Sequence, residues 1–289
     1  MAERAPAWVV PVMRAGYGAR AATYLIVGVL AFLAAWQGGQ AEGTTDAIEQ
    51  LRGYAWGLAA MWAIALGLIA YAAWRFIDAW MDLEDYGSNA KGIFARGGLI
   101  VTGAVHAALG VSVAASAIGI GGGGGGEGGG AQSLTQKVMA LPYGPLLVGL
   151  IGVGTLGAGG YYIYKGYAEK YKEDIRETPT TRRLDPVMKA GFVAEGIVVG
   201  IIGALIVFAA LTTDPSEAGG VGQALQEIRS VAFGRILLGA IGLGLVGFAV
   251  ENLVEAIYRI IPRRAGDDVM SMAHRAKLKA EGKLHEATA

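Results

Sequence analysis

Ionisable side chains that fall inside or beside long apolar stretches are the residues of this sequence that could do chemistry. Arg20, Arg96 and Glu195 occupy equivalent places in an internal repeat. A carboxylate inside a membrane is costly unless it is paired or neutral. We therefore expect Glu195 to form an ionic cluster with the two arginines, joined by Arg75. The alternative is that these side chains reach water separately, and a functional version of the cluster would gate or bind an ion.

His106 is the ionisable residue nearest the middle of an apolar stretch, and it shares a helix face with Gly103 and Gly110. This placement favours a hydrogen-bonded histidine packed against a neighbouring helix, with a proton relay as the alternative. Haem normally requires a second axial ligand, and the other histidines, His274 and His285, lie in the C-terminal tail. No cofactor is therefore predicted.

Glu251 and Glu255 lie one helical turn apart, and Arg259 follows one turn later. This spacing predicts a Glu-to-Arg pair at the membrane interface. Two carboxylates on one helix face can act as acid and base, but no histidine or metal ligand accompanies them. The sequence contains no cysteine, no HExxH motif and no GxSxG motif, so we predict no catalytic residue, no metal site and no enzyme activity.

The composition is that of a membrane protein. Hydrophobic residues make up 54% of the chain and charged residues only 17%, with a mean hydropathy of +0.45, whereas soluble domains carry about 25% charged residues. A membrane span needs roughly 20 apolar residues. In a soluble helical bundle, amphipathic helices would have to cover the apolar central helices. Six stretches approach the required length, and among Asp, Glu, Lys, Arg and His they contain only His106: residues 21–41, 53–74, 97–126, 138–164, 196–213 and 236–250.

The basic residues predict the topology of these six spans. With both termini on one side, all but four of the 24 lysines and arginines lie on that side; the four are Arg52, Lys137, Arg229 and Arg235. The positive-inside rule places the side that is rich in lysine and arginine, and therefore both termini, in the cytoplasm. The net charge is zero, so no global field attracts nucleic acid.

An internal repeat divides the six spans into three pairs. The first helix of each pair carries the similar segments RAGYGARA (from residue 14), AKGIFARG (from residue 90) and KAGFVAEG (from residue 189). A short polar helix pattern follows at residues 47–52, 133–139 and 224–230, and an aromatic–glycine pair then opens the second helix. Because each unit holds two helices, the repeats insert in parallel. We expect an all-α, pseudo-threefold bundle of six helices, in which a closed ring buries more surface than a row.

The repeats set the predicted boundaries along the chain. A lead-in covers residues 1–17, the repeats cover residues 18–88, 89–187 and 188–261, and a cytoplasmic tail covers residues 262–289. The glycine-rich insert in the second repeat, residues 121–130, is typical of a flexible linker. The connection at residues 167–185 and the tail mix both charge signs. We interpret them as solvated segments that could bind a cytoplasmic protein or anionic lipid headgroups.

Small residues recur at four-residue spacing within the spans, as in Ala59, Ala63 and Gly67, or Gly196 and Gly200. Such spacing lets helix backbones approach closely where lipid removes the hydrophobic driving force. Gaps that line a permeation path would use the same residues. We favour the packing interpretation.

The triplicated pattern, with its Gly-x-x-Ala-Arg-Gly entry and its aromatic–glycine start of the second helix, resembles the bacterial family of domain of unknown function 1206. The resemblance covers roughly residues 12–258, and it implies no activity. Glu195 in the arginine position and the glycine-rich insert depart from the pattern. We expect a multi-pass protein of the inner (plasma) membrane that is a structural, interaction or accessory subunit, in contact with lipids and a protein partner. The alternative is a channel or transporter for a small solute or ion.

Overall fold

The computed structural model describes residues 6–39, 41–120, 127–261 and 271–273. The described chain is almost entirely helical, and six helices are long and apolar enough to cross a membrane. The protein therefore has the expected all-α, six-span membrane fold. The spans are α1 (Val9–Gln37), α3 (Gly57–Met81), α4 (Ala90–Ala117), α6 (Gly144–Tyr167), α7 (Pro179–Thr212) and α9 (Gly234–Tyr258).

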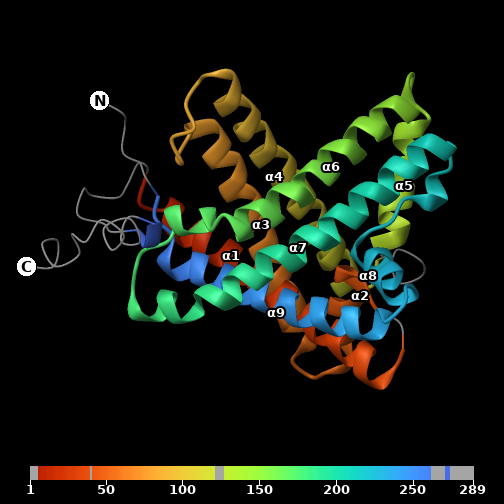
Figure 1. Ribbon diagram of the computed structural model, residues 1–289, viewed down its shortest axis with the longest axis horizontal. Helices are drawn as coiled ribbons and strands as arrows, with labels where there is room; N and C mark the ends of the chain where they lie inside the picture. Colours follow the sequence, from red (N-terminus) through yellow and green to blue (C-terminus); the bar gives the residue numbers. More distant parts are fainter. Residues whose placement is uncertain (1–5, 40, 121–126, 262–270, 274–289) are drawn as a thin grey trace, which may run out of the picture.

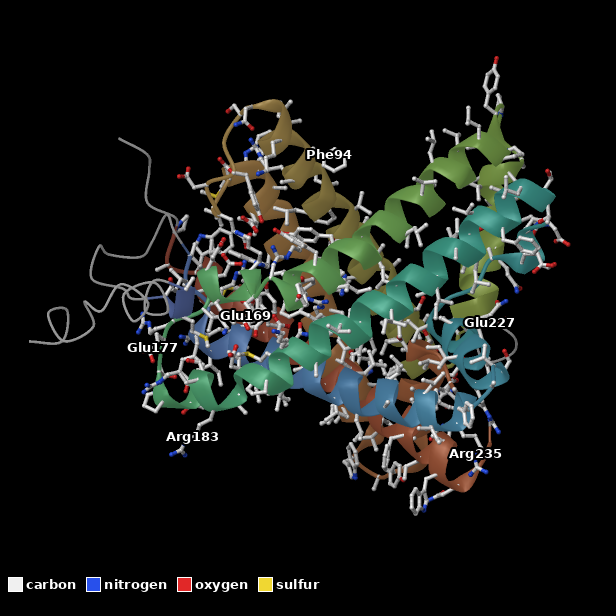
Figure 2. All side chains as sticks on the ribbon, viewed as in Figure 1. Phe94, Glu169, Glu177, Arg183, Glu227 and Arg235 are labelled. Carbon is white, nitrogen blue, oxygen red and sulfur yellow. The ribbon has the colours of Figure 1, made fainter. Side chains whose placement is uncertain are left out.

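Short helices gather at one end of the bundle, on the right in Figure 1. We call this the short-helix end, and we call the opposite end, where α1 begins and α9 ends, the terminal end. Figure 2 shows Glu227 and Arg235 at the short-helix end, and Glu169, Glu177 and Arg183 at the terminal end. The short elements are α2 (Thr44–Glu49), η1 (Gln50–Gly53), α5 (Glu127–Met139), η3 (Pro215–Glu217) and α8 (Val221–Ser230) at the short-helix end, with η2 (Lys170–Glu173) at the terminal end.

The aromatic–glycine pairs allow each short helix to end against the start of the next span. A Cβ atom on Gly144 would lie 2.2 Å from the carbonyl oxygen of Met139, and one on Gly234 would lie 2.1 Å from that of Arg229. Only glycine permits this approach. The preceding Tyr143 has φ +62°, a left-handed conformation that redirects the chain into α6.

Helices of successive repeats form the most extensive interfaces: α3 with α4, α6 with α7, and α9 with α1. Repeat one (α1–α3) and repeat three (α7–α9) also pack internally, through α1 with α3 and α7 with α9. Extensive contact between α4 and α6 of repeat two is absent, although both helices are fully described. The expected closed ring is therefore open at repeat two, and in Figure 1 the α3–α4 pair runs at a steep angle to the α6–α7 pair.

Glycines form the crossings between repeats. A Cβ atom on Gly242 would lie 2.8 Å from the carbonyl oxygen of Gly28, and one on Gly159 would lie 2.7 Å from that of Gly196. A larger residue at either crossing would push two helix backbones apart. The small residues at these positions hold helices together by close packing, as expected where lipid surrounds the bundle.

The first span begins earlier than the predicted boundary at residue 17. Helix α1 starts at Val9, and Val9, Met13 and Tyr17 are buried in one apolar cluster. The spacing of four residues places all three on one face of the helix. Most of the predicted lead-in is therefore part of the helical bundle.

The connection between α6 and α7 is anchored by buried apolar residues, while its charged residues stay at least partly exposed. Tyr171 and Ile175 are fully buried beside Phe192. Helix α7 already starts at Pro179, after Thr178, whose side chain caps it. Apolar residues between the charges explain the burial.

The remaining predicted segments fall partly outside the described residues. Residues 121–126 of the glycine-rich insert and residues 262–270 and 274–289 of the tail lie there. Glu127 and the three glycines after it belong to α5, so this part of the expected linker is helical.

Candidate functional site

Arg20 of α1 lies inside the bundle near the terminal end, and its side chain is only 5% exposed. Its Nη1 donates a hydrogen bond to the hydroxyl of Tyr71 at 2.9 Å. The guanidinium also lies 4.7 Å from the ring centroid of Tyr71, 5.4 Å from that of Tyr24 and 5.5 Å from that of Phe248. Cation–π attraction to aromatic faces partly replaces the water that a buried arginine loses.

Glu195 of α7 meets this arginine through a tyrosine. The hydroxyl of Tyr24 donates to Oε1 of Glu195 at 2.6 Å, while the ring of the same tyrosine lies against Arg20. Glu195 is buried, and a short hydrogen bond from a hydroxyl stabilises a buried carboxylate. The structure therefore brings Arg20 and Glu195 into one cluster, bridged by Tyr24.

Arg75 of α3 joins the same cluster. Its Nε donates to the hydroxyl of Tyr71 at 3.1 Å, so Arg20 and Arg75 share one acceptor. Its Nη1 pairs with Asp78 at 2.9 Å, and its Nη2 donates to the hydroxyl of Tyr17. All these groups are buried, so the charge of Arg75 is held by direct partners.

Arg96 lies apart from this cluster, which corrects its expected membership. Its Nε donates to the carbonyl oxygen of Ala79 at 2.6 Å, and its Nη2 donates to that of Trp80 at 3.2 Å. The last carbonyls of a helix have no partner within the helix, and arginines commonly bind them. Arg96 therefore fastens α4 to the end of α3, and Arg235 does the same for α9 at the end of α1.

Arg259, at the end of α9, joins all three repeats. It pairs with Glu255 of repeat three, as the spacing predicts, and with Glu84 of repeat one. Asp174 of repeat two lies 3.8 Å from its Nη2. Glu251 is also buried, one turn before Glu255. The predicted interfacial carboxylates thus belong to a larger ionic group than sequence reasoning proposed.

Two ion pairs that sequence reasoning missed lie at the ends of the second spans of repeats one and two, three residues out of register with each other. Arg75 lies 3.4 Å from Glu84, and Lys165 lies 3.9 Å from Asp174. In both repeats the acid follows the base by nine residues. This shared spacing was a signal in the sequence, because both bases also lie in the last turns of the second span of their repeat. We call the whole set the terminal-end network: Tyr17, Arg20, Tyr24, Tyr71, Arg75, Asp78, Glu84, Lys165, Asp174, Glu195, Glu251, Glu255 and Arg259.

The two acids of these ion pairs, Glu84 and Asp174, differ in electrostatics. Burial opposes the charge of Glu84, but Arg259 and Arg75 outweigh that effect and hold its pKa below the ordinary value. At Asp174, burial prevails over the attraction of Arg259 and Lys165 and raises the pKa. Glu84 is therefore the firmer anionic partner of Arg259.

His106 of α4 packs at the edge of the network. Its ring centroid lies 4.6 Å from that of Tyr71, and its Nδ1 lies 2.8 Å from the carbonyl oxygen of Thr102. The side chain is 9% exposed. This geometry gives His106 a hydrogen bond within its own helix and a packing contact with α3.

Apolar side chains fill the bundle between the network and the short-helix end. They come from α1, α7, α8 and α9 and include Val27, Ala31, Val198, Leu238 and Leu245. Among the described residues, no group of three metal-binding side chains occurs. The hydrogen bonds and ion pairs of the network hold charge and tie helices of all three repeats together.

Two hollows open on the outside of the bundle. One, of about 400 Å³, lies between α1 and α3 beside Ala19 and Gly67, and the other, of about 530 Å³, lies between α3 and α4 beside Trp80 and Arg96. Their walls are largely apolar, which suits lipid chains rather than a polar substrate.

Comparison with known proteins matches the repeats. A family model described as Domain of Unknown Function (DUF1206) matches residues 15–82, 97–169 and 190–259. The chain is 27% identical over 256 residues to the uncharacterized protein YxxB of Bacillus subtilis (strain 168), covering 87% of this chain and 92% of that protein. No solved structure matches. The three matched segments end before Glu84, before Asp174 and at Arg259.

Proposed function

The chain belongs to the DUF1206 family, and from this premise we propose that it is a membrane-embedded interaction protein, an accessory subunit without enzymatic activity. The open repeat two is the observation that carries the proposal. The surfaces of α4 and α6 that face the opening are uncovered, whereas the equivalent surfaces of the other repeats are packed. A further transmembrane helix would find there the kind of small-residue surface on which membrane helices pair.

The terminal-end network supports this role because it makes the rest of the molecule a rigid frame. The guanidinium of Arg259 lies within 4 Å of acids from all three repeats: Glu84, Asp174 and Glu255. Removing one member of a buried ion pair destabilises the folded protein strongly, because the remaining charge is left without a partner. The five packed interfaces between spans can therefore hold α4 and α6 in a fixed arrangement, with one open position between them for a partner helix.

Transport of a small solute or ion is the second candidate. The Nε of Arg20 has no acceptor among the described residues, so one buried donor is left for an anionic or polar solute. Against transport, the apolar cluster around Val27, Ala31 and Leu245 occupies the bundle beyond Arg20. A continuous polar path is the feature that a channel needs.

We place the protein in the plasma (inner) membrane, with the terminal end in the cytoplasm. The excess of lysine and arginine at that end supports this orientation by the positive-inside rule. The partner would then be an integral membrane protein, or a membrane protein that also contacts the cytoplasmic face, together with surrounding lipids. Reporters fused to the two termini would both be active in the cytoplasm, and a reporter active on the outer side would overturn the topology.

Reconstitution separates the two candidate functions. The interaction role predicts that liposomes with the purified chain leak ions and small solutes no faster than empty liposomes. It also predicts that the chain in mild detergent forms a complex heavier than the 29.8 kDa monomer, measured by light scattering with the detergent mass subtracted. Solute flux through a monomeric chain would overturn the interaction role in favour of transport.

A further inference from the structure

Repeats one and three close by the same contact between their two helices. A Cβ atom on Gly67 of α3 would lie 2.4 Å from Cβ of Ala19, and one on Gly244 of α9 would lie 2.4 Å from Cβ of Ala194. Both alanines are buried. Each glycine is the tenth residue after the glycine that opens its helix. The two contacts are therefore copies of one another.

Repeat two carries both halves of this contact but does not join them. Gly154 of α6 is the tenth residue after Gly144, and Ala95 of α4 stands at the position of the two buried alanines. Nothing lies within 4 Å of a Cβ atom placed on Gly154, and Ala95 is partly exposed. The chain thus has a matching pair of surfaces that remain uncovered.

Both helices of repeat two are held by other neighbours. On α4, a Cβ atom on Gly103 would lie 2.8 Å from the ring of Phe76, and one on Gly110 would lie 3.0 Å from the carbonyl oxygen of Ala65. On α6, Gly159 packs against α7 just as closely. Repeat two therefore stays open although both of its helices are firmly packed on neighbouring repeats.

We propose that repeat two closes between two copies of this chain, with α4 of one copy packed on α6 of the other and Ala95 seated on Gly154. This inference rests on the proposed interaction role and names its partner. A two-fold axis along the membrane normal keeps both copies in the same orientation. The helix of the second copy then runs antiparallel to its neighbour, as in repeats one and three. Such an interface uses the same pair of surfaces twice and closes on itself as a dimer.

Cysteine cross-linking tests the contact directly, because the natural chain contains no cysteine. One tagged chain carries Ala95→Cys, and a second chain with a different tag carries Ala158→Cys, one turn after Gly154 on the same face of α6. Both are expressed together and treated in native membranes with a short bis-maleimide. We expect a covalent dimer that contains both tags. Replacing Ala158→Cys by Gly160→Cys, on the opposite side of α6, is the control and removes the product.

Tryptophan substitution gives a second readout on the uncross-linked protein. Gly154→Trp fills the surface that receives Ala95 and converts the dimer to a monomer, halving the protein mass in mild detergent. Gly160→Trp is the matched control, because Gly160 is also an open, exposed glycine of α6. It leaves the dimer mass unchanged.

The remaining outcomes overturn the inference in distinguishable ways. A chain that carries both Ala95→Cys and Ala158→Cys and cross-links only within itself shows that repeat two closes internally. A complex heavier than the monomer without a product that joins the two tags shows that α4 of one copy does not pack on α6 of another, which overturns this inference and retains the interaction role. A monomer that conducts solutes excludes both proposals.

Discussion

Repeats one and three close on themselves, whereas repeat two, built from the same pattern, remains open. All three carry the glycine and alanine positions that make the closed contact possible, but only two of them use it. The connection between the spans is longest in repeat two, where it contains the glycine-rich insert and the 13-residue α5. A longer connection restrains its two helices less. Small residues permit a helix contact, and the neighbours and connections decide whether it forms.

The largest expected effect comes from Arg259→Ala, which removes the cation that lies against acids of all three repeats. The substitution leaves Glu255 and Glu84 buried without their shared cation. Breaking a buried ion pair by removing one partner costs about 3–5 kcal/mol. Thermal unfolding in detergent would show a large loss of stability. Stability equal to the natural chain would show that Arg259 does not join the repeats.

Glu84 of repeat one and Asp174 of repeat two, which both lie near Arg259, give the next contrast. Glu84→Gln removes an anion whose pKa is lowered, so a stabilising charge is lost at neutral pH, at a cost of about 1.5–3 kcal/mol for a charged hydrogen bond. Asp174→Asn replaces an acid whose pKa is raised, so its ionised form is disfavoured in the folded protein and the change costs little.

The sign of the pH dependence at Glu84 follows from the same shift. A lowered pKa in the folded state contributes stability that is present above the unfolded pKa and is lost as the pH falls through the folded value. The difference in stability between the natural chain and Glu84→Gln should therefore shrink in acid. A difference that grows in acid would show that Glu84 is not held as an anion by Arg259 and Arg75.

Substituting leucine for the equivalent glycines of repeats one and two compares the closed contact between α1 and α3 with the open position between α4 and α6. Gly67→Leu forces a side chain onto Ala19 inside repeat one and should cost about 1–3 kcal/mol, the range for overpacking. Gly154→Leu in repeat two meets no atom of its own chain and should leave monomer unfolding unchanged. Equal losses at the two positions would indicate that repeat two is closed as well.

The smallest effect is expected for Arg96→Ala, which removes two hydrogen bonds to the end of α3 at a partly exposed site. About 1 kcal/mol is typical for such bonds. The loss should appear in unfolding of the monomer and not in the cross-link between Ala95→Cys and Ala158→Cys. A loss as large as that of Arg259→Ala would place Arg96 in the buried network after all.

The membrane spans and their grouping into repeats are readable in the sequence because hydropathy and the recurring glycine patterns are local properties. The cluster of Arg20, Arg75 and Glu195 was also predictable, since buried charges need partners. The link through Tyr24 was not, because any polar side chain could have bridged Arg20 to Glu195. The prediction for Arg96 was wrong because this residue occupies the same repeat position as Arg20 but binds the free carbonyl oxygens at the end of α3.

The nine-residue spacing from Arg75 to Glu84 and from Lys165 to Asp174 could have been found in the sequence, because it recurs in two repeats. The opening of repeat two could not. The sequence around Gly154 is the same whether or not α4 packs against it. Whether that contact forms depends on the interfaces that α4 makes with α3 and that α6 makes with α7. Those interfaces exist only once the helices are placed in space.

A distance measurement between helices in lipid tests the openness of repeat two most directly. Spin labels at Val105 and Leu150 report on α4 and α6, and labels at Val29 and Ala63 occupy the equivalent exposed positions of α1 and α3. Each doubly labelled chain is diluted with unlabelled chain in liposomes, so that distances within one chain dominate the pulsed electron paramagnetic resonance signal. We predict a clearly longer distance in repeat two than in repeat one. Equal distances in the two repeats would contradict the open repeat and remove the basis for a partner helix there.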